Sequence, residues 1–384
     1  MTHTVEGDGD AMGNTLQNHG LINVLCFGVH DQLGGVETFV KNHYNHMDHQ
    51  AVHFDFVSQY SHMCFEEDFE QMGSTVYKIP NVKKNVIGYW RGISRLFKNQ
   101  NYDACYVNML SSANILPLYI AKKMKIKHII AHSHNGNTPK GTLRKIMHGF
   151  NRKALHRYVT DFWACSQTAG DWLFGQLPEG VLHVIPNAID TDCFRFCEKT
   201  RSEMRKSLDI EDCFVLGSVG RFTEQKNPLF LIDIFNKVKE KRGNSVLLLI
   251  GEGNLQSSIQ EKVDQLGLHE SVQFLGIQKH VEDYYQAMDC FLLPSLFEGL
   301  PVVLVEAQAA GLLCVVSSTI TKEVQLTDNL YYMDLDKTPG KWADYILNTK
   351  GKNRNKMYEM VKASGYDIAV ASQNFTKRFA ALLK

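Results

Sequence analysis

The sequence predicts an α/β protein of two doubly wound, Rossmann-like domains in tandem, and three observations support this prediction. Its 384 residues suffice for two domains of ordinary size. Beyond residue 20, short apolar runs alternate with segments of helical length, which is typical of βα units in a parallel sheet. The same alternation starts again near residue 213. Because such sheets bind ligands beyond the carboxyl ends of their strands, we expect the two domains to face a central cleft.

Apolar runs of strand length identify the two expected sheets. In the first domain they lie at 21–27, 53–57, 75–79, 104–107, 128–131, 162–164 and 181–185. In the second domain they lie at 214–219, 246–250, 272–275, 290–293 and 314–317. Helical patterns lie between most of them, including 86–98, 142–156 and a helix that opens near Pro228. A final amphipathic helix is expected at 366–384, and its pattern does not assign it to either domain.

The composition favours a globular, cytoplasmic protein. Hydrophobic residues make up 44% of the chain and charged residues 21%, and no apolar run approaches the ~20 residues that span a bilayer. Residues 1–20 have neither the basic start nor the apolar middle of a secretory signal, so we expect a disordered leader there. The nine cysteines show no metal-binding or redox spacing, which favours reduced thiols.

The charge is unevenly distributed although the net charge is zero. Residues 78–157 contain 16 Lys and Arg and one acidic residue, which leaves 25 basic and 40 acidic residues elsewhere. Such an asymmetry indicates an anionic partner or surface. Within this stretch Leu143, Ile146, Met147 and Phe150 recur at helical spacing among basic residues. They form either a core-facing stripe or a membrane-surface face, and the sequence leaves both interpretations open.

The strongest chemical signal is segment 294–306, in which seven residues separate Glu298 from Glu306. A buried strand is expected to end just before it, and a Glu-Gly turn then leads to Pro301 at the start of a helix. Backbone N–H groups at such a start suit a phosphate. Glu306, about two turns into the helix, could accept hydrogen bonds from both hydroxyls of a ribose. The alternative for Glu306 is a helix carboxylate paired with a nearby cation.

A second signal follows the strand at 214–219, where Arg221 and Lys226 bracket a turn before the next helix. An arginine fork and a lysine point charge at the carboxyl end of a strand suit a diphosphate. The alternative is a pair of solvated loop cations.

The first domain offers two weaker signals. Gly34 and Gly35 precede Glu37 directly after the first strand, and they permit either a close phosphate approach or a plain tight turn. His132 and His134 stand at the end of another strand, where a histidine could contact a sugar, act as an acid or base, or be structural.

No segment indicates a metal site. Asp190 and Asp192 could form an acidic clamp, but they follow Pro186-Asn187, so a turn in the connection between the domains explains them better.

Together these motifs resemble the retaining glycosyltransferases of family four, the group 1 type with two Rossmann-like domains, known as the GT-B architecture. The resemblance covers nearly everything from residue 21 to the end. The motifs that carry it are Gly34-Gly35-x-Glu37, the strand-end histidine, Val184-Ile185-Pro186-Asn187-x-x-Asp190, Gly220-Arg221 with Lys226, Ile250-Gly251-Glu252-Gly253, and Glu298 with Glu306.

The resemblance implies a set of site residues. The expected catalytic residues are His134, preferred over His132, and Glu298. The expected donor-binding residues are Gly35, Gly220, Arg221, Lys226, Glu298, Gly299, Leu300, Pro301, Val302 and Glu306. Secondary or acceptor contacts are expected from Gly34, Glu37, His132 and Asn135.

The resemblance also implies how the chain is divided. The final helix should return to the first domain, giving an acceptor-binding domain of 21–188 plus 366–384 and a nucleotide-sugar-binding domain of 189–365. No metal or other cofactor is expected.

We therefore expect a sugar to pass from a nucleotide sugar, with UDP as the default, to a glycan or lipid-linked acceptor in cell-surface polysaccharide assembly. The basic 78–157 stretch suggests peripheral contact with the cytoplasmic face of the membrane. A nucleotide-sugar 2-epimerase on the same scaffold is the first alternative. A nucleic-acid-binding module is a distant one, because the basic stretch has no stacking platform, so no nucleic-acid partner is expected.

Overall fold

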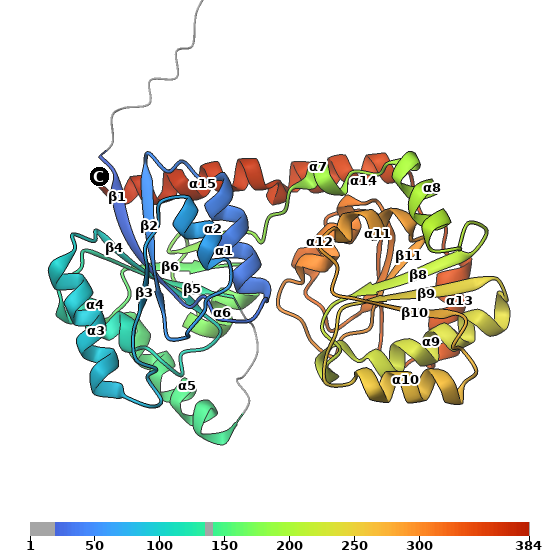
Figure 1. Ribbon diagram of the computed structural model, residues 1–384, viewed down its shortest axis with the longest axis horizontal. Coiled ribbons are helices and arrows are strands. Elements are labelled where there is room, and N and C mark those ends of the chain that lie inside the picture. Colours follow the sequence, from blue (N-terminus) through green and yellow to red (C-terminus); the bar gives the residue numbers. More distant parts are fainter. Residues whose placement is uncertain (1–19, 135–140, 384) are drawn as a thin grey trace, which may run out of the picture.

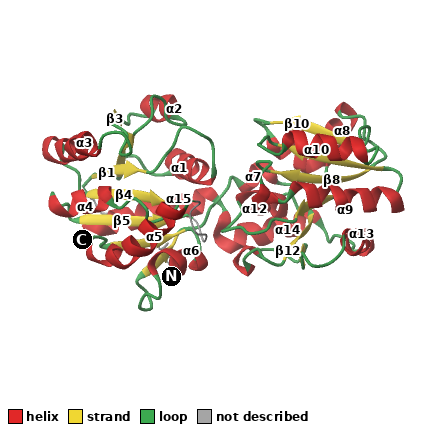
Figure 2. Cartoon of the chain, turned by 90° about the horizontal axis from the view of Figure 1, so that it is seen from below, coloured by secondary structure: helices red, strands yellow, loops and turns green. Residues whose placement is uncertain are grey.

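The structure, a computed structural model, describes residues 20–134 and 141–383. Within these ranges the chain forms two parallel sheets, of seven strands in the order β3-β2-β1-β4-β5-β6-β7 and of six in the order β10-β9-β8-β11-β12-β13. Figure 1 shows the two sheets side by side, and Figure 2 shows the strands of each flanked by helices. The predicted α/β fold of two doubly wound domains is confirmed.

The first sheet contains all seven strands expected there, with small shifts at their ends. Its strands are β1 (Ile22–Phe27), β2 (Val52–Ser58), β3 (Val76–Lys78), β4 (Ala104–Met109), β5 (His128–Ser133), β6 (Asp161–Ala164) and β7 (Leu182–Val184). Its helices are α1 (Gly35–His46), α2 (Glu66–Gln71), α3 (Val86–Asn99), α4 (Leu116–Lys123), α5 (Thr142–Ala154) and α6 (Gln167–Phe174). One face of the sheet packs on α1, and the other packs on α3, α4 and α6.

The second sheet contains one strand that the sequence did not predict. Its strands are β8 (Phe214–Val219), β9 (Ser245–Ile250), β10 (Val272–Gly276), β11 (Cys290–Leu293), β12 (Leu313–Ser317) and β13 (Leu330–Met333). The unpredicted strand is β13, a short strand at the edge of the sheet in which only Leu330 is fully buried. A strand that is only partly buried lacks the continuous apolar run that marked the central strands.

Nine α-helices follow α6 along the described part of the chain, and all but the last belong to the second domain. They are α7 (Thr191–Phe194), α8 (Glu198–Ser207), α9 (Pro228–Lys241), α10 (Gln256–Gln265), α11 (Val281–Ala287), α12 (Val302–Ala309), α13 (Pro339–Asn348), α14 (Arg354–Val361) and α15 (Ile368–Ala380). The last of them, α15, belongs in packing to the first sheet, where its Phe375 and Phe379 join the core that α1 covers.

The chain passes between the two sheets twice, and the two passages lie side by side. Ile189 on the outward passage forms an isolated parallel bridge with Asp367 on the return. The hydroxyl of Thr191 donates to Asp367 over 2.6 Å, which joins the passages a second time. Asp367 also caps α15 by accepting from the backbone N–H of Val370. The return helix is thus fixed at the point where it leaves the second domain (Figure 1).

The structure tests the prediction on membrane-spanning segments but not the prediction of a disordered leader. No helix of the described ranges is long and apolar enough to cross a bilayer. Apart from Gly20, the expected leader lies outside the described residues.

Candidate donor-binding and transfer site

The two predicted donor motifs of the second domain meet at one edge of the sheet. Strands β8 and β11 are neighbours, so the loops that follow them leave from adjacent carboxyl ends. The backbone N–H of Leu296 in the second loop donates to the carbonyl of Gln225 in the first over 2.8 Å. Lys226 and Glu298 therefore lie together although they are far apart along the chain.

Glu298 is fixed by three polar partners. Nζ of Lys226 lies 2.7 Å from its Oε1, and the hydroxyl of Ser295 donates to the same oxygen over 2.8 Å. The amide of Gln225 donates to Oε2 over 3.2 Å. The Glu298 side chain is only 8% exposed. A carboxylate held this firmly can accept hydrogen bonds in a fixed direction, as recognition of a sugar hydroxyl requires.

Arg221 has a different environment from Lys226. Its side chain is exposed and forms no ion pair with any residue that the structure describes. Gly220 before it has a φ of +147°, a conformation that a glycine adopts without strain. A Cβ atom on Gly251 would lie 2.2 Å from the carbonyl oxygen of Gly220, so the Gly251-Glu252-Gly253 motif lets the β9 loop close against this turn. The arrangement leaves a guanidinium without a described ion-pair partner beside the Lys226–Glu298 pair.

The helix after the second loop begins at Val302, with Pro301 as its N-cap. This corrects the expectation that Pro301 is the first helical residue, a shift of one position. No side chain caps the helix. The N–H of Leu304 donates to the carbonyl of Pro301, whereas those of Val302 and Val303 are available to an anion. Leu300 is buried, and its carbonyl accepts from the Asn187 amide in the connection between the domains over 3.3 Å.

Glu306 lies on α12 and is bound by a residue that the sequence did not indicate. The phenol of Tyr285 on α11 donates to Oε2 of Glu306 over 2.9 Å, and no cation pairs with this carboxylate among the described residues. Burial raises the pKa of Glu306 from 4.5 to about 7, against the lowering effect of the Tyr285 hydrogen bond. Tyr285 sits in an ordinary helical pattern, so no sequence signal distinguishes it.

His132 lies in β5 and His134 directly follows it, and the two side chains differ in exposure and in hydrogen-bond partners. His132 is fully buried, and its Nδ1 lies 2.5 Å from the hydroxyl of Tyr106. His134 is partly buried, and its Nε2 lies 2.8 Å from Oδ1 of Asn108. Because an amide oxygen only accepts, Nε2 of His134 carries the proton and Nδ1 is the ring's acceptor. Burial lowers the pKa of His134 to about 3, so the ring is neutral at physiological pH.

The glycine loop after β1 and the start of α1 lie near these histidines. The ring of Phe39 on α1 is 4.9 Å from that of His134. Gly35 is exposed at the first position of α1, and Gly34 is its N-cap. Glu37 is buried and accepts from the backbone N–H and the ring of His30, both over 3.0 Å. Glu37 thus binds its own loop.

Two further expectations have simple outcomes. Asp190 caps α7 by accepting from the backbone N–H groups of Asp192 and Cys193, which is the turn that the sequence favoured over a metal clamp. No cluster of three possible metal ligands occurs in the described ranges. Asn135 lies outside the described residues.

The structure thus brings the predicted residues together in two groups. Gly220 to Lys226, Glu298 to Val302 and Glu306 meet on the second domain, whereas Gly34, Gly35, Glu37 and the histidines lie on the first. No hydrogen bond or ion pair joins the two groups within the described ranges.

Comparisons with known proteins identify the family of the chain. The family described as Glycosyltransferase Family 4 matches residues 33–193, and the family described as Glycosyl transferases group 1 matches residues 200–335. EpsF of Bacillus subtilis (strain 168), which carries a provisional glycosyltransferase name, is 32% identical over 356 residues, covering 89% of this chain and 91% of its own.

Two further relatives have more specific names. The capsular polysaccharide biosynthesis glycosyltransferase CapH of Staphylococcus aureus is 26% identical, covering 80% of this chain and 84% of its own. A UDP-Gal:alpha-D-GlcNAc-diphosphoundecaprenol alpha-1,3-galactosyltransferase of Escherichia coli is 27% identical, covering 58% of this chain and 60% of its own.

A solved structure supports the fold. The crystal structure of Anabaena HepE in complex with UDP superposes with a TM-score of 0.70 at 18% identity, covering 93% of this chain and 95% of that one. EpsF, CapH and the Escherichia coli enzyme all carry glycosyltransferase names and give the epimerase alternative no support. The chain belongs to family four of the glycosyltransferases, the group 1 type, and is a glycosyltransferase of GT-B architecture.

Proposed function

We propose that this enzyme transfers a sugar from a UDP-sugar to a lipid-linked glycan, with retention of anomeric configuration, in cell-surface polysaccharide assembly. The observation that carries the proposal is the meeting of the β8 and β11 loops, where Lys226 pairs with Glu298 beside the exposed Arg221. The two cations, Arg221 and Lys226, and the uncapped N-terminus of α12 together form a binding site for a diphosphate. The names of the Escherichia coli relative and of the HepE complex support UDP.

The donor is proposed to lie along the second domain, 189–365. Arg221 and Lys226 hold the diphosphate, Gly220 lets it approach the turn, and Glu306 accepts from the ribose hydroxyls. Glu298 and the backbone of 299–302 contact the sugar. Because Glu298 is already locked by Lys226, it binds in a fixed orientation and costs little to order.

Transfer is proposed to proceed by attack from the face that the diphosphate leaves. The bond between the anomeric carbon and the diphosphate oxygen breaks, and its electron pair stays on the diphosphate. The acceptor hydroxyl bonds to the same face of that carbon and passes its proton to the departing phosphate oxygen. Arg221, Lys226 and the start of α12 stabilise the charge on the leaving group.

His134 and Gly35 of the first domain, 21–188 plus 366–384, are proposed to complete the site around the sugar and the phosphate. At its low pKa the neutral His134 ring is a weak base at physiological pH. We therefore assign it a hydrogen bond to the reacting sugar. His132, Asn135, Gly34 and Glu37 remain proposed secondary contacts.

We also propose that helix α5 contacts the cytoplasmic face of the membrane, because its apolar face points outward. Leu143, Ile146, Met147 and Phe150 are 70%, 62%, 42% and 83% exposed. The core-facing interpretation of this stripe is therefore wrong. The only buried residue of α5 is His148.

The inner side of α5 is polar, which is the reverse of an ordinary surface helix. The backbone N–H of Ser112 donates to Nδ1 of His148 over 3.2 Å, and the His148 ring stacks on Trp172 at 4.6 Å. Asn151 donates to the carbonyl of Ser112 over 2.8 Å. Polar contacts thus attach the helix to the domain and leave its apolar side unpartnered among the described residues.

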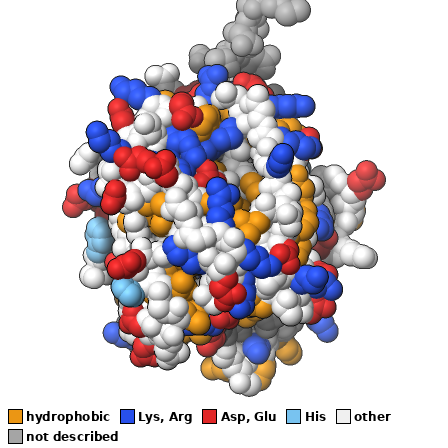
Figure 3. All heavy atoms as spheres, turned by 90° about the vertical axis from the view of Figure 1, so that its right-hand side faces the viewer, with side chains coloured by type: hydrophobic (Ala, Val, Ile, Leu, Met, Phe, Trp, Pro, Cys, Tyr) orange, Lys and Arg blue, Asp and Glu red, His pale blue; other side chains and the backbone are white. Residues whose placement is uncertain are grey.

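Basic side chains surround this apolar face and lack carboxylate partners in the described part of the chain. Arg144, Lys145 and Lys153 of α5 are exposed. Among the described Lys and Arg of 78–157, only Lys78 forms an ion pair, with Glu66. By contrast, the face of the second domain in Figure 3 carries basic and acidic side chains together. An apolar stripe with basic edges is the composition that binds an anionic bilayer surface.

The donor assignment is tested by a thermal-shift screen of UDP, GDP, ADP and their sugar derivatives. We expect UDP to raise Tm, because a ligand that binds only the native state stabilises it. The shift should be lost in Arg221→Ala and retained in Arg242→Ala. Stabilisation by another nucleoside diphosphate, with none by UDP, contradicts the UDP assignment.

The membrane assignment is tested separately by co-sedimentation with vesicles of phosphatidylglycerol and phosphatidylcholine. We expect binding that Phe150→Ser weakens by about tenfold or more, since a buried phenylalanine contributes roughly 1.5–3 kcal/mol. Ile277→Ser is the matched control, because Ile277 is 69% exposed on the second domain. Equal losses in both variants, or equal binding to pure phosphatidylcholine, contradict the α5 assignment.

A further inference from the structure

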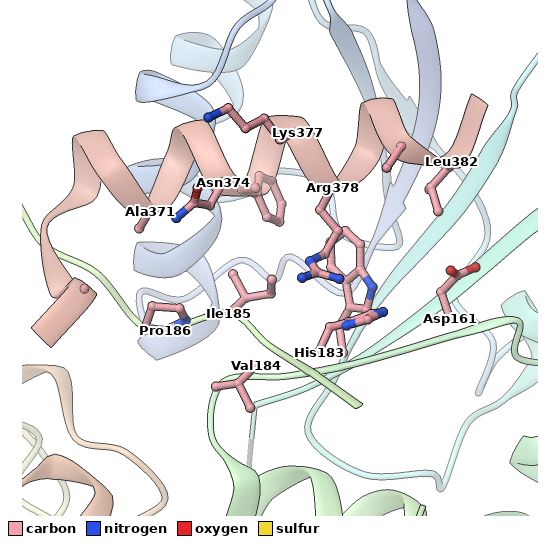
Figure 4. A pocket seen from close by; sticks show the side chains of 14 residues that line it. Asp161, His183, Val184, Ile185, Pro186, Ala371, Asn374, Lys377, Arg378 and Leu382 are labelled. Carbon is pink, nitrogen blue, oxygen red and sulfur yellow. The ribbon is translucent and has the colours of Figure 1, made fainter. Parts of the chain in front are cut away.

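A cavity lies away from the donor loops, where the C-terminal helix covers the edge of the first sheet. It has a volume of about 520 Å³ and is bounded by β6, β7, the chain that leaves β7, and α15. In Figure 4, Asp161, His183 and Pro186 lie on one side of it, and Arg378 of α15 and Leu382 of the turn that follows α15 approach from the other. None of the residues proposed for the donor or the transfer lines this cavity.

Arg378 places a guanidinium at the cavity, where burial lowers its pKa and the charge of Asp161 raises it. It is partly buried and forms no hydrogen bond or ion pair within the described ranges. Figure 4 shows it extending from α15 toward β7, where His183 lies. Burial lowers the pKa of His183 and the charge of Arg378 lowers it further, while Asp161 offsets part of this effect, so the net shift favours the neutral imidazole.

Asp161 is the acidic residue of the cavity lining, and it has two further partners outside the cavity. Asp161 accepts from the hydroxyl of Thr160 over 2.5 Å, and its Oδ2 lies 3.7 Å from Nδ1 of His128. Lys377 also lines the cavity and is exposed. The charge balance around the cavity therefore favours an anion.

The indole N–H of Trp163 is the second hydrogen-bond donor at the cavity that lacks an acceptor. Trp163 lines the cavity and is fully buried, and its Nε1 has no hydrogen-bond partner among the described residues. A buried donor without a partner destabilises the protein, and a bound acceptor would remove that cost. Apolar side chains also line the cavity, among them Ile185, Phe375, Ala381 and Leu382.

We propose that this cavity binds an oxyanion, a phosphate or a carboxylate, carried on a small apolar body. The guanidinium of Arg378 pairs with the oxyanion, and the N–H of Trp163 donates to the ligand. The apolar body lies against Ile185, Phe375 and Leu382. The volume falls in the range of small-molecule sites, roughly 300–1,000 Å³.

The site also touches both chain segments that join the domains. Ile185 and Pro186 belong to the outward passage, and Gly365, with a φ of +82°, marks a kink in the return passage. An occupant thus contacts the two segments that any closure of the domains must bend.

The test uses the full chain and two aromatic anions, phenyl phosphate and benzoate, with inorganic phosphate for comparison. Binding is measured by calorimetry and by tryptophan fluorescence, with UDP absent and at saturation. We expect at least one aromatic anion to bind about tenfold or more tightly than inorganic phosphate, which corresponds to about 1.4 kcal/mol. The preference between phenyl phosphate and benzoate identifies the oxyanion.

Variants separate this site from the donor site. Arg378→Ala should weaken binding by tenfold or more, Arg378→Lys less, and Trp163→Phe should remove the fluorescence change. Arg91→Ala, at an exposed arginine of α3, and Arg221→Ala should leave binding unchanged. The proposal is overturned by unaltered binding in folded Arg378→Ala, by loss of binding in Arg221→Ala, by competition from UDP, or by no binding up to about 10 mM. None of these outcomes tests the assignment of the donor site, which depends on the separate UDP measurements.

Discussion

The hydroxyl of Tyr285 lies 2.9 Å from Oε2 of Glu306 and 3.2 Å from the carbonyl oxygen of Val303. A phenol has one proton to donate, so its direction depends on the charge of Glu306. When Glu306 is ionised, the proton points to the carboxylate. When Glu306 is protonated, the hydroxyl can accept from it and donate to Val303. Tyr285 can therefore accommodate both forms of the carboxyl group.

The first prediction concerns the pH dependence of donor binding. Glu306 must be ionised to accept from two ribose hydroxyls, and its pKa in the free protein is about 7. UDP affinity should therefore rise with pH and level off above about pH 8, with a loss of about tenfold for each unit below 7. Calorimetry from pH 5.5 to 8.5 measures this. Because the phosphates of UDP also titrate, Glu306→Gln is the control, and the same pH profile in this variant would contradict the assignment.

The second prediction concerns stability, for which the same pKa gives a definite sign. Folding raises the pKa of Glu306 from 4.5 to about 7, so the native state holds this proton more firmly than the unfolded state. The contribution is fully present below pH 4.5 and is lost as pH rises through 7. Glu306→Gln should flatten that part of the profile of unfolding free energy against pH, measured by urea denaturation. Parallel profiles of unfolding free energy against pH for the two proteins would show that folding does not raise the pKa of Glu306.

The third prediction is that Tyr285→Phe weakens donor binding more than turnover. The variant removes the hydrogen bond that stabilises ionised Glu306, so the pKa of this carboxyl group rises further. The transition in the plot of KM against pH should therefore move to higher pH. At pH 7 we expect KM for the donor to rise by about tenfold with a smaller change in kcat, since hydrogen bonds to charged groups contribute about 1.5–3 kcal/mol.

The matched control for Tyr285 is its neighbour. The hydroxyl of Tyr284 donates to Gln278 over 3.0 Å, away from Glu306. Tyr284→Phe should leave the pH profile in place. A loss of activity in Tyr285→Phe without any shift along the pH axis would indicate a purely structural role.

The fourth prediction is that Lys226→Ala lowers kcat/KM by about 10²–10³-fold, because one preorganised cation at the leaving group contributes on that scale. It also leaves Glu298 without its cation. Lys237→Ala is the control, since Lys237 pairs with Glu240 on the outer surface of α9. Near-normal turnover of Lys226→Ala at saturating donor would contradict the diphosphate role.

The fifth prediction concerns a contact between the domains. Glu323 of the second domain accepts from the backbone N–H groups of Gln167 and Thr168, over 2.7 and 2.9 Å, at the start of α6 in the first. Glu323→Ala removes this contact and should raise the radius of gyration measured by small-angle X-ray scattering. Glu323→Gln, which keeps one acceptor oxygen, should give a smaller increase. Identical scattering for all three proteins would show that other contacts hold the domains.

The local parts of the site could be predicted because each depends on a short stretch of sequence. A strand, a glycine turn and a helix start within about ten residues locate Arg221 and Lys226 in one loop and Glu298 in another. Parallel sheets place all such loops at one edge, so the approach of Lys226 to Glu298 follows from the fold class. The shift at Pro301 and the missed strand β13 mark the limits of that local information.

The sequence by itself determined the two-domain α/β fold, the family and the loops that carry the donor motifs, because hydrophobic periodicity and turn residues report local conformation. Only the tertiary structure decided which face of α5 points outward, since a periodic pattern shows that a helix has an apolar side but not what covers it. The tertiary structure also decided that Tyr285 donates to Glu306, that Glu323 contacts the start of α6, and that Arg378 lines a cavity. Those contacts join residues far apart in the chain, and packing alone brings them together.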